Sequence, residues 1–470
     1  MTKHESQRGI SPAVLTLSVL LALLAGGGAG LVAGRLTAHG STGPGASGRP
    51  ARPAPGSTDG SRAVSGRSSV GRRSSAGSIA GSSTRSGGTP NATPSLGSSA
   101  RSSAKSPPTG SAATQSGSAA SRSARSGASR SGTAATTARP ALVVTSIAPA
   151  DGSTAVPATS RITVTFSAAP AAGSAVPSVA PSTPGAWQVV GDSLTFTPSA
   201  PFVPLSQVSV TVPGGRSGVH AQDGATLDQS VVDRFRIEDG SVLRLQQLLS
   251  LLDYSPLAFR PSPAEIPPTD TSAQLAALYH PPGGSFTWRE KGWPARLLAM
   301  WHPGTFDVFT KGLVMSFQAD HGIAPDGAVG PETWAALLQA WAQHDVNTGG
   351  YDYALADKTP PETLSAYHDG RLLLRSRANT GIAGSPTPDG TFPVYTRLRR
   401  QVMRGTNPDG THYADLVQYI AYFHGNDAVH YMPRAGYGIP QSLGCIELPL
   451  ADAARVWPYL AYGTLVTVVG

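Results

Sequence analysis

Residues 441–448 read Gln-Ser-Leu-Gly-Cys-Ile-Glu-Leu, and they include Cys445, the only cysteine in the 470-residue chain. A single thiol cannot form an internal disulfide or a multi-cysteine metal site. It is therefore either an inert core residue or a nucleophile. Ser442 and Gly444 predict a tight polar turn, which places the thiol where the chain bends and not inside the core. These neighbours favour the nucleophile.

Two histidines precede this cysteine, His430 by fifteen positions and His424 by twenty-one. A cysteine nucleophile needs a base that accepts its proton. The segment around His430 predicts a strand in which Val429 and Tyr431 share one face and His430 points to the other. We expect His430 to be the base, with His424 at a hairpin corner as the alternative. A zinc site on these two histidines is a weaker hypothesis, because no third ligand stands at metal-ligand spacing.

Residues 349–470 are predicted to form a β-rich domain around this site. Residues 363–374 predict a hairpin with an Asp-Gly turn, and residues 416–431 predict a strand, a turn at Gly425 and a returning strand. Three segments in order, Thr387–Phe392 (Thr-Pro-Asp-Gly-Thr-Phe), Ala428–Tyr431 and Ser442–Leu448, resemble the L,D-transpeptidase catalytic domain. Leu443 departs from that pattern by replacing a second histidine, and Glu447 stands where a basic or polar residue is common.

The resemblance implies a peptidoglycan cross-linking enzyme without a metal or cofactor. Cys445 would attack a donor stem peptide, and His430 would accept the thiol proton or form an imidazolium beside a thiolate. The backbone N–H groups of Gly444 and Cys445 would stabilise the oxyanion, and the Ser442 hydroxyl would support the turn. The partners would be donor and acceptor stem peptides and glycan strands. The alternatives are an L,D-carboxypeptidase on the same stems and a decayed wall-binding scaffold, the latter motivated by Leu443.

Residues 1–38 are predicted to be a signal anchor. Residues 13–34 are an uncharged, apolar run long enough to span a bilayer once, preceded by Lys3 and Arg8. A cleaved signal peptide is the alternative, although its apolar part is usually shorter. Both a signal anchor and a cleaved signal peptide would direct the rest of the chain out of the cytoplasm. We expect a single-pass membrane protein whose catalytic domain lies outside the cytoplasm, in the cell wall.

Residues 39–140 are predicted to be a disordered linker rich in Ser, Gly, Ala and Arg, because they contain too few large apolar residues to form a core. From Arg35 to Arg139, thirteen Arg and one Lys stand against Asp59 alone. The whole chain carries a formal net charge of only +8, so the other residues together are net negative. The positive charge belongs to an exported linker, which suits anionic lipid or wall polymer better than nucleic acid, and solubility without a binding partner is the alternative.

Two further domains are expected before the catalytic domain. Residues 141–239 contain short alternating strands separated by Pro and Gly, which predict a β-sandwich and resemble bacterial immunoglobulin-like domains. Residues 240–348 change to a helical period with three apolar stripes, around Leu245, Leu313 and Trp334. They resemble a three-helix peptidoglycan-binding domain through Phe317-Gln318, Asp326-Gly327 and Gly330–Trp334 (Gly-Pro-Glu-Thr-Trp), with a long insert after the first helix. The sequence as a whole predicts a multidomain, mainly β protein.

Overall fold

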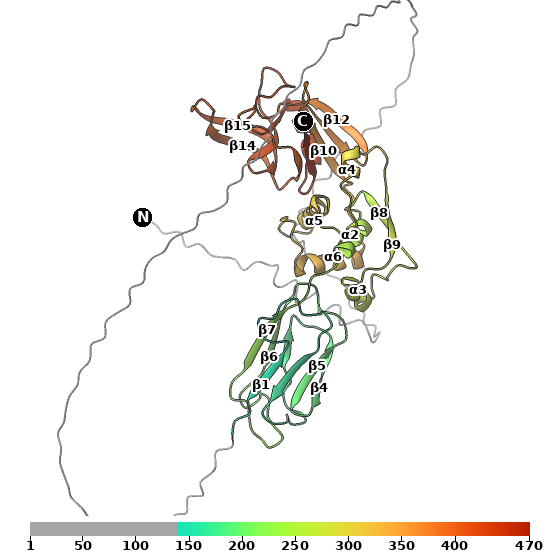
Figure 1. Cartoon of the computed structure of the whole chain (residues 1–470), viewed down its shortest axis with the longest axis vertical. Helices are drawn as coiled ribbons and strands as arrows, with labels where there is room; N and C mark the ends of the chain where they lie inside the picture. Colours follow the sequence, from blue (N-terminus) through green and yellow to red (C-terminus); the bar gives the residue numbers. More distant parts are fainter. Residues whose placement is uncertain (1–139) are drawn as a thin grey trace, which may run out of the picture. The chain divides into compact units, whose positions relative to one another are not determined.

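The computed structural model describes residues 140–470, so the predicted anchor at 1–38 and the predicted linker up to residue 139 lie outside the described residues. Within the described part, no helix is both long and apolar enough to cross a membrane. Figure 1 shows two strand-rich regions, β1–β7 and β10–β18, with the longer helices in the sequence between them. This order confirms the predicted mainly β chain with one helical domain.

The amino-terminal domain consists of two antiparallel sheets. Its strands are β1 (Val144–Ala148), β2 (Ile162–Phe166), β3 (Ser178–Ala180), β4 (Gly185–Val190), β5 (Ser193–Pro198), β6 (Gln207–Val212) and β7 (Val231–Arg236). The sheet orders are β1-β2-β5-β4 and β3-β6-β7. In β2, Ile162, Val164 and Phe166 are buried while the threonines between them are half-buried, which is the period-two pattern of a strand with one face on a core. The expected β-sandwich is confirmed.

The helical domain follows and contains the three expected helices with additional elements in the insert. Its elements are α2 (Val242–Leu251), β8 (Leu257–Pro261), α3 (Thr271–Ala277), β9 (Gly284–Trp288), α4 (Ala295–Leu298), α5 (Val308–Asp320) and α6 (Pro331–Gln343). The three stripes of apolar residues from α2, α5 and α6 meet in one core, where Leu248, Phe317 and Trp334 are at most 2% exposed. Trp334 is thus a core residue, as its position in an apolar stripe predicted.

Residues of the peptidoglycan-binding-like motif form buried hydrogen bonds at the turn between α5 and α6. Gln318 Nε2 donates to Ala328 O at 2.8 Å, and Gln318 Oε1 accepts from the Gly327 N–H at 2.8 Å. One buried amide therefore satisfies the turn between α5 and α6. A second buried amide, Gln246 on α2, binds the end of the insert. Its Nε2 donates to His302 O, and its Oε1 accepts from the Gly304 N–H.

The carboxy-terminal domain contains two sheets. Its elements are β10 (Asp352–Asp357), β11 (Thr363–His368), β12 (Arg371–Arg377), β13 (Gly390–Pro393), β14 (Thr396–Thr406), β15 (His412–His424), β16 (Asp427–Tyr431), β17 (Ile446–Leu448), α7 (Leu450–Val456), the 3₁₀ turn η1 (Trp457–Tyr459) and β18 (Leu465–Val469). The sheet orders are β12-β11-β10-β18-β13 and β14-β15-β16-β17. The second sheet carries Cys445 beside its last strand, and the β16–β17 pair is parallel.

Both hairpins predicted in this domain are present. Strands β11 and β12 pair antiparallel around Asp369 and Gly370, whose φ angles of 45° and 73° are those of a tight hairpin turn. Strands β15 and β16 pair antiparallel around Gly425. The structure extends β15 back to His412, so that β14 and β15 form a long hairpin that continues beyond the rest of the sheet.

A crossing of two loops supports the segment that leads to the cysteine. The loop at Gly381 bridges to Ser442, and a Cβ added at Gly381 would lie 2.6 Å from Thr387 N and closer still to Ser385 O. Gly381 therefore approaches the backbone of residues 385–387 in its own loop at a distance that only glycine permits.

We expect Gly381→Ala to lower the free energy of unfolding by about 1–3 kcal/mol, because the new methyl group must displace backbone atoms. Gly384→Ala is the matched control, since a Cβ there meets no atom within 4 Å. It should change stability by less than about 0.5 kcal/mol. Urea unfolding of both variants measures the difference, and equal stabilities would contradict this close approach of Gly381 to residues 385–387.

Candidate active site

The turn that presents Cys445 requires glycine at the preceding position. Gly444 has φ of +116°, and a Cβ there would lie 3.0 Å from Asp427 Cγ. Ser442 Oγ donates to Cys445 O at 2.6 Å and accepts from the Gly444 N–H at 3.2 Å. The Ser442 hydroxyl thus closes the turn, and the Gly444 N–H, expected as an oxyanion donor, is already shared with that hydroxyl.

Two hydroxyls from a distant loop hold the same turn from outside. Thr387 Oγ1 donates to Gly444 O at 2.8 Å and accepts from the Gly381 N–H at 2.9 Å, and the Thr387 side chain is fully buried. Ser385 Oγ donates to Leu443 O at 3.0 Å. Thr387 belongs to the Thr-Pro-Asp-Gly-Thr-Phe segment, but its role as a support for the cysteine turn was not apparent from the sequence.

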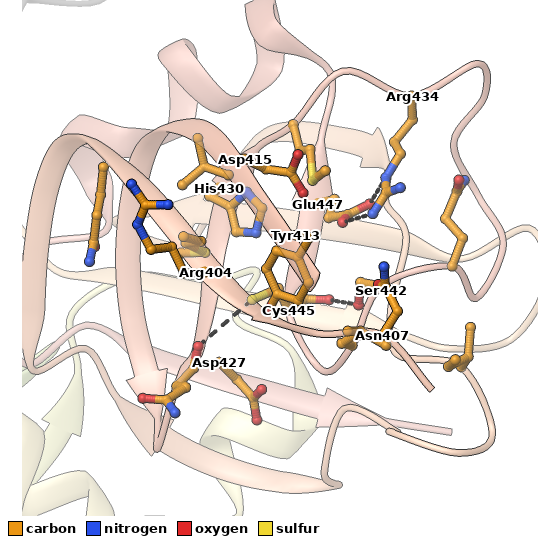
Figure 2. A pocket seen from close by; sticks show the side chains of 18 of the residues that line it. Arg404, Asn407, Tyr413, Asp415, Asp427, His430, Arg434, Ser442, Cys445 and Glu447 are labelled. Carbon is orange, nitrogen blue, oxygen red and sulfur yellow. Dashed lines mark hydrogen bonds and ion pairs between the residues drawn. The ribbon is translucent and has the colours of Figure 1, made fainter. Parts of the chain in front are cut away.

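His430 lies on the strand beside the cysteine. Parallel pairing of β16 with β17 sets Val429 opposite Ile446 and His430 opposite Glu447. Val429 faces the core, whereas His430 faces a cavity of about 720 Å³ that Cys445 also lines. His430 is 2% exposed and its Nδ1 is buried without a hydrogen-bond partner. Figure 2 shows the imidazole and the thiol directed into the same cavity.

Burial favours the neutral form of both groups. Loss of solvent around Cys445 raises the pKa of its thiol to about 12, with Asp427 and Glu447 adding repulsion. Loss of solvent also lowers the pKa of His430 below its ordinary value. Of the two resting states left open by the sequence, a neutral thiol beside a neutral imidazole fits this environment.

His424, the alternative base, lies outside the set of residues that line the cavity. Its Nδ1 lies 3.2 Å from Asp427 Oδ2, and its ring packs against Phe392 with centroids 4.7 Å apart. Asp427 itself lines the cavity with Cys445 and His430. The structure thus brings Cys445, His430, Ser442 and Gly444 together and connects His424 to them only through Asp427.

The hairpin of β14 and β15 and one ion pair complete the cavity wall. Arg404, Tyr413 and Asp415 line it from the hairpin. Arg434 binds Glu447 with two contacts, Nε to Oε2 at 2.8 Å and Nη2 to Oε1 at 2.5 Å. A guanidinium therefore stands beside the unusual Glu447. No periodic signal in the sequence links the two residues, because their contact depends on the loop between β16 and β17.

Within the described range 140–470, no group of three or more His, Cys, Asp or Glu side chains is arranged to hold a metal ion.

Each of the three described domains contains a match to a known family model. Residues 351–468 match the L,D-transpeptidase catalytic domain, residues 138–236 match a bacterial Ig-like domain, and residues 299–337 match a peptidoglycan binding domain. No curated protein matches the chain.

Several solved structures are similar to the chain, including three L,D-transpeptidases. The enzyme from Mycobacterium smegmatis is 14% identical over 70% of this chain and 100% of its own, with a TM-score of 0.24. L,D-transpeptidase 3 from Mycobacterium tuberculosis is 14% identical over 70% of this chain and 98% of its own, also with a TM-score of 0.24. The catalytic domain from E. faecium is 26% identical over 26% of this chain and 100% of its own, with a TM-score of 0.24.

We expect Thr387→Val to lower the free energy of unfolding by about 1–3 kcal/mol, because the Gly444 carbonyl and the Gly381 N–H lose their buried partner. Thr387→Ser retains the hydroxyl and should recover most of that loss. Denaturant titration compares the two variants with the unaltered chain. A valine variant as stable as the serine variant would show that this hydroxyl does not hold the turn.

We expect alkylation of Cys445 by iodoacetamide to accelerate about tenfold per pH unit between about pH 7 and pH 10. The thiolate is the reactive form, and a thiol whose pKa is near 12 gains thiolate throughout that range. Cys445→Ala provides the background rate. A plateau that begins near neutral pH would instead indicate a preformed imidazolium–thiolate pair.

Proposed function

We propose that the protein is a peptidoglycan L,D-transpeptidase that forms an acyl-enzyme on Cys445, because residues 351–468 match that catalytic domain. The observation that carries the proposal is the placement of the only thiol and a buried imidazole in one cavity. Cys445 directly precedes β17, His430 lies on the parallel neighbour β16, and both side chains line that cavity. Acyl transfer through a cysteine requires a base near the thiol, and a shared cavity supports that role for His430.

In the first half of the reaction, the donor is a tetrapeptide stem with diaminopimelate at its third position. His430 takes the proton of the thiol as Cys445 Sγ attacks the diaminopimelate carbonyl carbon. The C–N bond to the terminal D-alanine then breaks, and His430 returns the proton to the leaving amine. A neutral imidazole suits this role, because only the unprotonated ring can accept the proton.

The tetrahedral intermediate needs donors for its oxyanion. The Cys445 N–H is one candidate, and the Gly444 N–H is a second that must be shared with Ser442 Oγ, 3.2 Å away. Removing one such donor typically costs about 3 kcal/mol of transition-state stabilisation. The turn held by Thr387 fixes these N–H groups before substrate arrives.

Charged groups in the cavity support a peptide substrate with carboxylates. Arg404 projects from the β14–β15 hairpin into the cavity (Figure 2) and offers a cation for a stem carboxylate. The Arg434 guanidinium is already paired with Glu447, so it supports the wall and does not present a free charge.

The other domains suggest where the reaction takes place. The match of residues 299–337 to a peptidoglycan binding domain supports attachment to glycan strands in the cell wall. The predicted anchor at 1–38 would hold the chain at the outer side of the membrane.

We expect a carbapenem to form a covalent adduct with this protein, detectable by intact-mass spectrometry, and Cys445→Ala to form none. His430→Ala should slow adduct formation about 10²–10⁴-fold, the usual contribution of a general base. His424→Ala is the matched control and should react within about threefold of the unaltered chain, because His424 lies outside the cavity lining.

Incubation with donor and acceptor stems then identifies the reaction. Dimeric muropeptides would establish transpeptidation, and trimmed tripeptides alone would assign an L,D-carboxypeptidase. Absence of an adduct on the folded chain would contradict the proposal and favour the wall-binding scaffold.

A further inference from the structure

Asp427 is a carboxylate placed directly beside the nucleophile. It is the first residue of β16, and a Cβ on Gly444 would lie 3.0 Å from its Cγ. Its side chain remains 18% exposed and lines the cavity with Cys445. In Figure 2, Asp427 lies on one side of Cys445 and the Arg434–Glu447 pair lies on the other.

The cavity contains two other carboxylates, and neither has this position. Glu447 is 2% exposed and is neutralised by the two contacts with Arg434. Asp415 lies on β15 in the hairpin wall, and the carboxylates whose charge acts on the Cys445 thiol are Asp427 and Glu447. Of the two carboxylates that act on the thiol, Glu447 pairs with the guanidinium of Arg434, whereas Asp427 pairs with the imidazole of His424.

His424 fixes the orientation of this carboxylate. The contact from His424 Nδ1 to Asp427 Oδ2 at 3.2 Å engages one carboxylate oxygen. The other oxygen, Oδ1, is the one nearest the Gly444 backbone. An oriented carboxylate in a partly buried site binds a cation more strongly than a mobile one on the surface.

A carboxylate here disfavours the first half of the reaction. Its negative charge opposes formation of a thiolate at Cys445. Its position instead suits the second half, in which the sulfur carries an uncharged acyl group and the incoming acceptor amine is an ammonium ion at neutral pH. Leu443, at the position of the absent second histidine, lines the same cavity with an apolar side chain that cannot bind such a cation.

We propose that Asp427, oriented by His424, binds the ammonium group of the acceptor stem beside the Cys445 acyl-enzyme. This inference rests on the proposed transpeptidase function. The bound ammonium loses one proton to water, and the nitrogen lone pair forms a C–N bond with the thioester carbon. The C–S bond breaks, the second amine proton passes through His430 to the leaving sulfur, and the free thiol is restored.

The test measures partition of the acyl-enzyme between nucleophiles in the full chain. The donor is a tetrapeptide stem ending in D-alanine, and the acceptors are a diaminopimelate tripeptide, which is cationic, and hydroxylamine, which is uncharged at neutral pH. Mass spectrometry quantifies amide, hydroxamate and hydrolysed donor. Asp427→Asn is compared with Asp415→Asn, a matched change in another carboxylate of the same cavity.

We expect Asp427→Asn to raise the tripeptide concentration needed for half-maximal transfer about tenfold or more, while the ratio of hydroxamate to hydrolysed donor changes less than about twofold. The hydroxylamine reaction also shows that the variant is folded. Asp427→Glu should recover part of the transfer, and Asp415→Asn should retain it.

Two results would overturn the inference alone. One is normal transfer to the tripeptide in Asp427→Asn, and the other is an equal loss in Asp415→Asn. If the unaltered chain releases no D-alanine from the donor and forms neither amide nor hydroxamate, the proposed function fails and this inference fails with it. The hydroxylamine product therefore distinguishes the two failures.

Discussion

The buried hydroxyl of Thr387 is the interaction on which the site depends. It joins the Gly381 N–H to the Gly444 carbonyl, so one side chain fixes two loops that are far apart in the sequence. Without it, a buried donor and a buried acceptor would be unpaired, which is costly in a core. The positive φ of Gly444 and the hydroxyl of Ser442 complete the turn locally. Side-chain hydroxyls that bind the backbone of its turn thus position Cys445, whose side chain also packs against Val417, Ile420 and Ala428.

Parallel pairing of β16 and β17 then determines what surrounds the thiol. It sets His430 against Glu447 on the cavity face while Val429 enters the core. Burial makes both the thiol and the imidazole prefer their neutral forms. Such an environment keeps the fraction of Cys445 thiolate small at neutral pH. The carboxylate of Asp427 strengthens this preference.

Local periodicity predicted the three longer helices and several strands of the described residues. Strand β2 and helix α2 alternate apolar and polar residues with clear periods, and the structure confirms both. Strand β4 was missed because it is a sheet edge whose residues are almost all exposed, including Val189 and Val190, so it has no alternating pattern. The antiparallel pair of β8 and β9 inside the insert was missed for a different reason. Its two strands are separated in the sequence by a helix, α3, so no short turn connects them.

The sequence by itself selected the candidate residues of the site, because each has a local signature. Cys445 is the only thiol, Gly444 marks a turn, and His430 alternates with apolar neighbours on a strand. Only the tertiary structure decided how they are supported and charged. Thr387 contacts Gly444 across 57 positions, and Arg434 pairs with Glu447 across a loop. The physical reason is that hydrogen bonds and charge interactions act over a few ångströms in space, and no spacing along the chain encodes which distant residues the sheet brings within that range.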